Sequence, residues 1–216
     1  MRRRLDLSLV LVTDRTLAAG RSLDDLVRAA VRGGVTAVQL REKDCSTRQF
    51  LEIGRSVREA CRTLGVPFIV NDRADLAFIL KADGIHIGQD DLQPRDARRL
   101  LGPDAVVGLS VETLEQAIEA EVEDVDYLGV SPIFATPTKP ETRGEWGLAG
   151  LIKLRRLTRR DLVAIGGINA DNAGSVIEAG ADGIAVVSAV CAAAIPELAA
   201  RDLRKAVDGA RTKGSR

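Results

Sequence analysis

The chain alternates short apolar runs that are typical of β-strands with longer segments of helical periodicity, and it does so eight times without interruption. In the helical segments apolar residues recur every three or four positions, as in Leu23-Leu26-Val27-Ala30-Val31. The candidate strands are Leu7–Thr13, Ala37–Arg41, Phe68–Asp72, Gly84–Gly88, Ala105–Ser110, Tyr127–Ser131, Leu162–Gly166 and Gly183–Val187. Because parallel strands are joined by helical crossovers, this alternation predicts a parallel α/β sheet.

Two architectures accommodate such a sheet: a closed (β/α)8 TIM barrel and an open, doubly wound sheet. An open sheet binds its ligand at one switch point, whereas a barrel gathers all its loops at one face. Here polar or glycine-containing segments follow nearly every candidate strand, which favours the barrel. The segments 81–85 and 180–184 both place a helix end and a glycine directly before a strand, which supports the phasing. No change of composition marks a linker, so we predict one barrel domain over residues 1–216.

Composition narrows the class of function. The 31 basic and 31 acidic residues balance and only 3% of residues are aromatic, so the chain lacks the basic surface and stacking platforms of nucleic-acid-binding proteins. No apolar stretch approaches the roughly 20 residues that span a membrane. Cys45, Cys61 and Cys191 are scattered without CxxC spacing, which argues against a disulfide framework or a zinc site. We expect a cytoplasmic protein that acts on small molecules; the sequence sets no expectation of oligomeric state.

A charged cluster, Gln39-Leu40-Arg41-Glu42-Lys43-Asp44, follows the second candidate strand. Side chains alternate along a strand, so Gln39, Arg41 and Lys43 share one face. Two cations and an amide on one face suit a pyrophosphate, which Arg binds bidentately and Lys binds as a point charge. The alternative interpretation is a solvated charge run in a loop.

Carboxylates follow the third and fourth candidate strands. Asp72 ends one of these strands, and Asp90 and Asp91 follow the other. Hard cations such as Mg²⁺ use one or two protein carboxylates together with substrate phosphate oxygens. Helix capping by these aspartates is the alternative, and spacing alone does not distinguish Asp90 from Asp91. The only histidine, His86, lies inside the fourth strand, as an acid-base residue or as a hydrogen-bonded strand histidine.

The remaining strand ends carry hydroxyls and glycines. Ser110 ends the fifth strand, either at the site or as an N-cap for a helix near Leu114–Glu121. The long connection 131–144 is rich in Pro, Thr and Lys and is predicted to close over phosphate groups, with an irregular surface loop as the alternative. Gly166-Gly167 and Val187-Ser188 follow the last two strands, where barrels often bind a phosphate through backbone N–H groups.

Taken together, these motifs resemble the thiamine phosphate synthase family over nearly the whole chain. The resemblance rests on Gln39-Leu40-Arg41-Glu42-Lys43, Asn71-Asp72-Arg73, His86-Ile87-Gly88-Gln89-Asp90-Asp91, Gly108-Leu109-Ser110, 132–139, 164–168 and Val187-Ser188. It implies a (β/α)8 barrel that joins a pyrimidinylmethyl pyrophosphate to a thiazole phosphate, giving thiamine phosphate and pyrophosphate.

The resemblance also implies roles for individual residues. The pyrimidine pyrophosphate would contact Gln39, Arg41, Lys43, Asn71, Ser110 and Lys139. The thiazole phosphate would contact Thr136, Thr138, Gly167, Val187 and Ser188. Mg²⁺ would be held by Asp72 and Asp91, the later of the two neighbouring aspartates. Departure of pyrophosphate would leave a cation for capture by the thiazole nitrogen.

One segment departs from the family pattern. Many family members carry a histidine shortly after the fifth-strand serine, where this chain has Val111-Glu112-Thr113. The related thiazole tautomerases use a histidine in that region, so its replacement argues against a tautomerase-like barrel. A non-catalytic barrel that binds phosphorylated metabolites is the other alternative.

Overall fold

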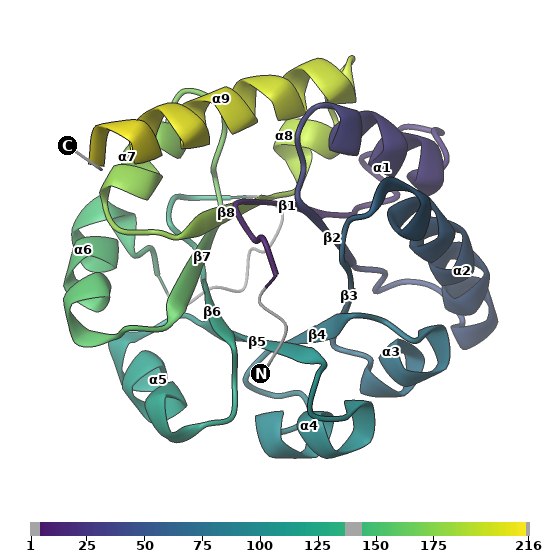
Figure 1. Ribbon diagram of the computed structural model, residues 1–216, viewed down its shortest axis with the longest axis horizontal. Helices are drawn as coiled ribbons and strands as arrows, with labels where there is room; N and C mark the ends of the chain where they lie inside the picture. The colour runs from purple at the N-terminus through teal and green to yellow at the C-terminus, as the bar shows by residue number, and fades with distance from the viewer. Residues whose placement is uncertain (1–4, 137–143, 215–216) are drawn as a thin grey trace.

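Eight parallel strands close into a barrel surrounded by helices in the computed structural model, which describes residues 5–136 and 144–214 (Figure 1). The strands pair in sequence order, and β8 pairs with β1. Their bounds are β1 Leu9–Val12, β2 Ala37–Leu40, β3 Phe68–Asn71, β4 Gly84–Ile87, β5 Val106–Val111, β6 Tyr127–Val130, β7 Asp161–Ile165 and β8 Gly183–Val186. The predicted barrel is therefore confirmed, and the open-sheet alternative is wrong.

The helices form the outer layer of the barrel (Figure 1). Their bounds are α1 Leu23–Arg32, α2 Thr47–Leu64, α3 Ala74–Leu80, α4 Pro94–Leu101, α5 Leu114–Glu119, the 3₁₀ turn η1 Ala120–Val122, α6 Gly147–Leu157, α7 Ala173–Glu178, α8 Ser188–Cys191 and α9 Pro196–Gly214. The periodic segment beginning at Leu23 folds as α1, and its Leu23, Leu26, Val27 and Ala30 are buried. No helix among the described residues is long and apolar enough to cross a membrane.

Two apolar cores result from the alternation of side chains along the strands. Outward residues such as Leu9 and Leu11 pack under the helices in the larger core. Inward residues such as Val10, Tyr127 and Val163 form a smaller core inside the barrel. The interior is therefore filled by side chains, and the polar inward positions are concentrated toward the carboxyl ends of the strands.

The repeated Asp-Gly-Ile pattern has a structural role in fixing strand register. The Asp83 carboxylate accepts a hydrogen bond from Phe68 N–H at 2.9 Å, while Asp83 N–H donates to Phe68 O at 2.8 Å. Asp182 forms the same reciprocal pair with Leu162, and Asp126 forms it with Val107. The Thr36 hydroxyl replaces the carboxylate in an equivalent pair with Leu9. Each odd-numbered strand is thereby fixed to the residue that precedes the next strand.

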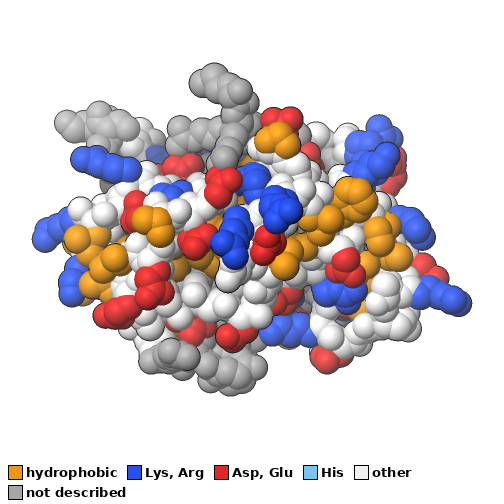
Figure 2. Space-filling view, turned by 90° about the horizontal axis from the view of Figure 1, so that it is seen from below, with side chains coloured by type: hydrophobic (Ala, Val, Ile, Leu, Met, Phe, Trp, Pro, Cys, Tyr) orange, Lys and Arg blue, Asp and Glu red, His pale blue; other side chains and the backbone are white. Residues whose placement is uncertain are grey.

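The surface carries charges of both signs. Figure 2 shows one side of the barrel on which acidic and basic side chains are interspersed and apolar groups lie between them. This mixture agrees with the balanced composition of the chain.

Candidate active site

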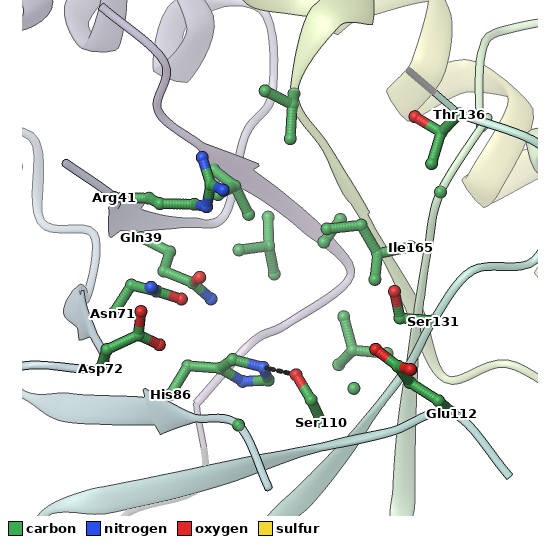
Figure 3. Close-up of a pocket in the computed structure, with 18 of the residues that line it drawn as sticks. Gln39, Arg41, Asn71, Asp72, His86, Ser110, Glu112, Ser131, Thr136 and Ile165 are labelled. Atoms are coloured by element: carbon green, nitrogen blue, oxygen red, sulfur yellow. Dashed lines mark hydrogen bonds between the residues drawn. The ribbon is translucent and has the colours of Figure 1, made fainter. Parts of the chain in front are cut away.

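A cavity of about 410 Å³ opens at the carboxyl ends of the strands. It is lined by most of the residues singled out from the sequence, namely Gln39, Arg41, Lys43, Asn71, Asp72, Asp91, Ser110, Thr136, Gly167, Val187 and Ser188. Asp90 also lines it. Thr138 and Lys139 lie outside the described residues. Figure 3 shows Gln39, Arg41, Asn71 and Asp72 on one side of the cavity, with Thr136 and Ile165 on the other.

The charged segment after β2 places some side chains in the cavity and one between neighbouring loops. Gln39 is only 6% exposed, and Arg41 is half-buried. The backbone N–H of Arg41 donates a hydrogen bond to Thr13 Oγ1 at 3.1 Å. Glu42 lies between the cavity-lining Arg41 and Lys43 but does not line the cavity itself. Its side chain is 4% exposed and pairs with Arg15 in the loop after β1, at 3.1 Å. Lys43 and Asp44 are exposed in an irregular segment, so the alternative of a solvated charge run in a loop is contradicted only at Glu42.

Burial changes the acidity of the Glu42 carboxyl. Desolvation raises the pKa of its carboxyl, and the nearby Arg15 guanidinium opposes that rise. The Glu42–Arg15 ion pair connects the loops after β1 and β2. It thereby restrains the backbone that carries Arg41 and Lys43.

The two carboxylates predicted to bind metal lie close together. The pKa of Asp72 is raised to about 6, mainly by burial and next by a side-chain interaction with Asp91. The cations Lys43 and Arg41 oppose this rise. Asp91 Oδ2 accepts a hydrogen bond from Gly88 N–H at 2.7 Å, which holds it at the end of β4. Two neighbouring carboxylates repel each other when both are ionised, and a divalent cation between them would relieve that repulsion.

Helix capping does not account for either aspartate. The N-cap of α3 is Arg73 and that of α4 is Gln93, and neither helix has a side-chain cap hydrogen bond. Asp72 instead adopts a left-handed backbone conformation, with φ of 60°. In the described part of the chain, no three or more His, Cys, Asp or Glu side chains gather as a metal cluster. A pair of carboxylates completed by phosphate oxygens and water is nevertheless a common Mg²⁺ arrangement.

His86 is hydrogen-bonded through both ring nitrogens. Its Nδ1 lies 2.9 Å from Tyr127 Oη. Its Nε2 lies 2.8 Å from Ser110 Oγ, the contact drawn as a dashed line in Figure 3. The interpretation of His86 as a hydrogen-bonded strand histidine is thus confirmed. The suggestion that Ser110 caps the next helix is wrong, because Thr113 caps α5 through a capping box with Gln116.

The other side of the cavity is built mainly from backbone. Gly166 and Gly167 have φ of 103° and 64°, a conformation that glycine adopts without strain. A Cβ on Gly166 would lie 2.6 Å from Pro132 Cβ, and one on Gly167 would lie 2.7 Å from Phe134 Cβ. The glycines therefore allow the connection after β6 to pack on the loop after β7, where Phe134 N–H donates to Gly166 O at 3.1 Å.

Val187 and Ser188 line the cavity at the start of α8. Val187 is the N-cap residue and Ser188 begins the helix. The first N–H groups of a helix have no partner within it and are suited to bind an anion.

Several lining residues were not assigned to the site from the sequence. They include Gln89, Gln116, Ser131, Tyr127 and Ile165, together with Glu112, whose place near the site was expected but whose role was not. Gln89 Nε2 donates to Ser110 O at 2.6 Å, and Gln116 Oε1 accepts from Glu112 N–H at 2.7 Å. The available signal was position, because Gln89 stands in the same motif as Asp91 and Ser131 directly follows a strand.

Active sites of barrels of this kind lie at the carboxyl ends of the strands, where this cavity opens. By fold and site, the protein is a (β/α)8-barrel enzyme with a pocket suited to phosphorylated small molecules. Within that class the chain belongs to the thiamine monophosphate synthase family, whose model matches residues 9–190.

Individual relatives agree with this membership. The chain is 54% identical over 202 residues to the thiamine-phosphate synthase of Albidiferax ferrireducens, covering 94% of this chain and 92% of the relative. It is 50% identical over 208 residues to that of Moorella thermoacetica, covering 96% and 98%. Among solved structures, thiamine phosphate pyrophosphorylase from Pyrococcus furiosus superposes with a TM-score of 0.87 at 40% identity, covering 95% of this chain and 97% of that one.

Proposed function

We propose that this protein couples a pyrimidinylmethyl pyrophosphate with a thiazole phosphate to give thiamine phosphate and pyrophosphate. The observation that carries the proposal is the identity of about 50% to thiamine-phosphate synthases along nearly the whole chain. The cavity supports it, because anion-binding side chains and a pair of carboxylates lie on one side and glycine-rich backbone lies on the other.

The pyrophosphate substrate is assigned to the part of the cavity formed after β2 to β5. Arg41 and Lys43 would bind its phosphate oxygens, while Gln39, Asn71 and Ser110 would orient the substrate. Lys139 belongs to this set by family resemblance. When bound at Asp72 and Asp91, Mg²⁺ would stabilise the charge that grows on the departing pyrophosphate.

The thiazole phosphate is assigned to the part formed after β6 to β8. Backbone N–H groups near Gly167, Val187 and Ser188 would bind its phosphate, with Thr136 and Thr138 contributing hydroxyls. Holding the thiazole nitrogen in line with the pyrimidinylmethyl carbon would convert an encounter of two molecules into a reaction within one complex. A cavity that excludes water would protect the cation until the nitrogen captures it.

The test is incubation of the purified protein with both substrates and Mg²⁺, followed by mass spectrometry. We expect thiamine phosphate only when all three are present. Absence of coupled product from a folded, metal-loaded protein would refute the proposal. Rearrangement of a thiazole phosphate without coupling would instead support a tautomerase-like barrel, and binding without turnover would support a metabolite-binding barrel.

We also propose that the chain acts as a single catalytic domain in the cytoplasm. The free cysteines Cys45, Cys61 and Cys191 agree with a reducing compartment. Burial raises the pKa of Cys61 to about 12 and that of Cys191 to about 11, so neither thiol is reactive at neutral pH.

A further inference from the structure

The His86 ring is fixed within the barrel by the residues across from it. In the strand register His86 pairs with Gly108, and Gly108 pairs with Tyr127. A Cβ on Gly108 would lie 2.1 Å from Tyr127 Cζ, and a Cβ on Gly129 would lie 2.6 Å from His86 Cε1. The two glycines thus provide the space that the two rings occupy, with centroids 5.5 Å apart.

The hydrogen bonds of these rings have a single consistent direction. Tyr127 is 3% exposed, and among the described residues the only hydrogen-bond partner of its hydroxyl is His86 Nδ1. Burial raises the pKa of the phenol, so it keeps its proton, and His86 Nδ1 is the acceptor that the described residues offer to it. A neutral imidazole has one acceptor and one donor nitrogen, so Nε2 carries the hydrogen. A doubly protonated ring would leave the Tyr127 hydrogen without an acceptor.

Ser110 receives the other end of this chain of hydrogen bonds. His86 Nε2 lies 2.8 Å from Ser110 Oγ. In the Nε2–H tautomer this nitrogen donates to the hydroxyl oxygen, which occupies one lone pair and leaves the hydroxyl hydrogen to point elsewhere. Within residues 5–136 and 144–214, Ser110 Oγ has no second protein partner, and Ser110 lines the cavity. Gln89 Nε2 also holds the Ser110 carbonyl, at 2.6 Å.

We propose that Tyr127 and His86 are positioning residues that make Ser110 a hydrogen-bond donor of fixed direction, aimed at an acceptor oxygen of the pyrophosphate substrate. This inference rests on the proposed function for the identity of that ligand. A serine hydroxyl normally rotates between donor and acceptor roles. If the hydroxyl is fixed as a donor before binding, less conformational entropy is lost when the ligand binds. The anion then meets the hydroxyl hydrogen and not a lone pair.

The first test uses the fact that the chain contains one histidine. In untagged protein labelled with ¹⁵N at the imidazole, NMR reports the tautomer of His86 alone. We expect the Nε2–H form to dominate near neutral pH. Tyr127→Phe should increase the Nδ1–H form, because the hydroxyl that selects the tautomer is removed. A dominant Nδ1–H form in the natural protein would overturn the proposal, whatever reaction the protein catalyses.

The second test asks whether His86 acts through Ser110. His86→Gln keeps a donor that can reach Ser110 and should stay within about threefold of the natural kcat/KM. The shorter His86→Asn should lose about threefold to tenfold, which is typical of one hydrogen bond. In a Ser110→Ala background, His86→Asn should have no further effect.

Two results would contradict this second expectation. One is an equal loss from His86→Asn with and without Ser110, and the other is an equal loss from Asn and Gln. Thermal melts of each variant separate folding effects from positioning, and Tyr127→Phe serves as the second variant if His86→Asn fails to fold. Failure of the coupling reaction in the natural protein would refute the proposed function, while the NMR test of the tautomer would still stand.

Discussion

The two halves of the cavity are lined by different chemical groups. In the half after β2 to β5, which we call the side-chain half, the lining groups include Arg41, Lys43, Asp72 and Asp91. In the half after β6 to β8, the backbone half, they include Gly166, Gly167, Val187 and Ser188. The side-chain half presents formal charges, whereas the backbone half presents peptide groups at close approach.

Because of this difference, the two halves should be sensitive to different kinds of substitution. A change that keeps shape but removes charge should damage the side-chain half, since the field at the ligand comes from ionised groups. A change that adds volume should damage the backbone half, because an added Cβ would meet Pro132 or Phe134. The predictions below are ordered from the largest expected effect to the smallest.

The largest effect is expected from Asp72→Asn or Asp91→Asn. Each change keeps size but removes an anionic oxygen, so activity should fall by about 100-fold or more, by analogy with loss of one preorganised electrostatic contact. Raising Mg²⁺ or Mn²⁺ should partly restore the rate. The measurement is rate against metal concentration, with Asp90→Asn as the neighbouring control. If Asp90→Asn alone shifts the metal dependence, the assignment of Asp91 is wrong.

Gly167→Ala should raise the KM for the thiazole phosphate by about tenfold, because a small displacement of the β6 connection misplaces that substrate. Gly65→Ala is a matched control. Gly65 has a similar φ of 71°, but no atom lies within 4 Å of a Cβ placed there. Both variants should lose about 1 to 2 kcal/mol of stability from the left-handed backbone. An equal rise in KM for both would show that the contact with Phe134 is not responsible.

A smaller effect concerns pH and the stability of the metal-free protein. The Asp72 pKa of about 6 lies above the model-compound value of 3.8, so unfolding releases this proton between those pH values. The contribution of this group to the free energy of unfolding is therefore fully present below pH 3.8 and is lost as pH rises through about 6. Removing the charge should reverse that loss, so Asp72→Asn should gain about 1 kcal/mol, or 2–4 °C in Tm, at pH 7 but not at pH 4.

Thermal melts of the natural protein and Asp72→Asn across this pH range provide the measurement. Added Mg²⁺ at pH 7 should stabilise the natural protein more than the variant, because only the natural protein keeps both carboxylates. A Tm difference that does not depend on pH would contradict the raised pKa of Asp72.

The smallest effect is expected from Ser188→Ala. The N–H groups at the start of α8 remain, so kcat/KM should stay within about threefold. Ser110→Ala removes a hydroxyl from the side-chain half and should cost about 10- to 100-fold. Steady-state kinetics with each substrate varied in turn provide the comparison. Equal losses at the two serines would remove the distinction between the halves.

The fold was predictable because its determinants are local. Apolar runs such as Phe68–Asn71 lie between amphipathic helices, and strand ends deviate from prediction by at most two residues, as at Leu7 and Leu9. The end of the helix near Glu121 was less predictable. There α5 ends at Glu119 and continues as the 3₁₀ turn η1, a local change of hydrogen bonding that periodicity does not encode.

The site was predictable where a strand end alone determines position. Gln39 and Asp72 line the cavity because each lies at or just beyond the end of a strand. The link from Tyr127 through His86 to Ser110 was missed because it depends on register across β4, β5 and β6. Register depends on how neighbouring strands pair, and it cannot be read from a single sequence. The roles of Thr138 and Lys139 stay predictions.

The reciprocal pairs at Thr36, Asp83, Asp126 and Asp182 divide the barrel into four two-strand units. A chain split between β4 and β5 keeps every such pair within one fragment, whereas a split between β5 and β6 separates Val107 from Asp126. Fragment complementation should therefore succeed more readily at the first break than at the second. The same pairing makes the two-strand unit the natural module for building chimeric barrels from related sequences.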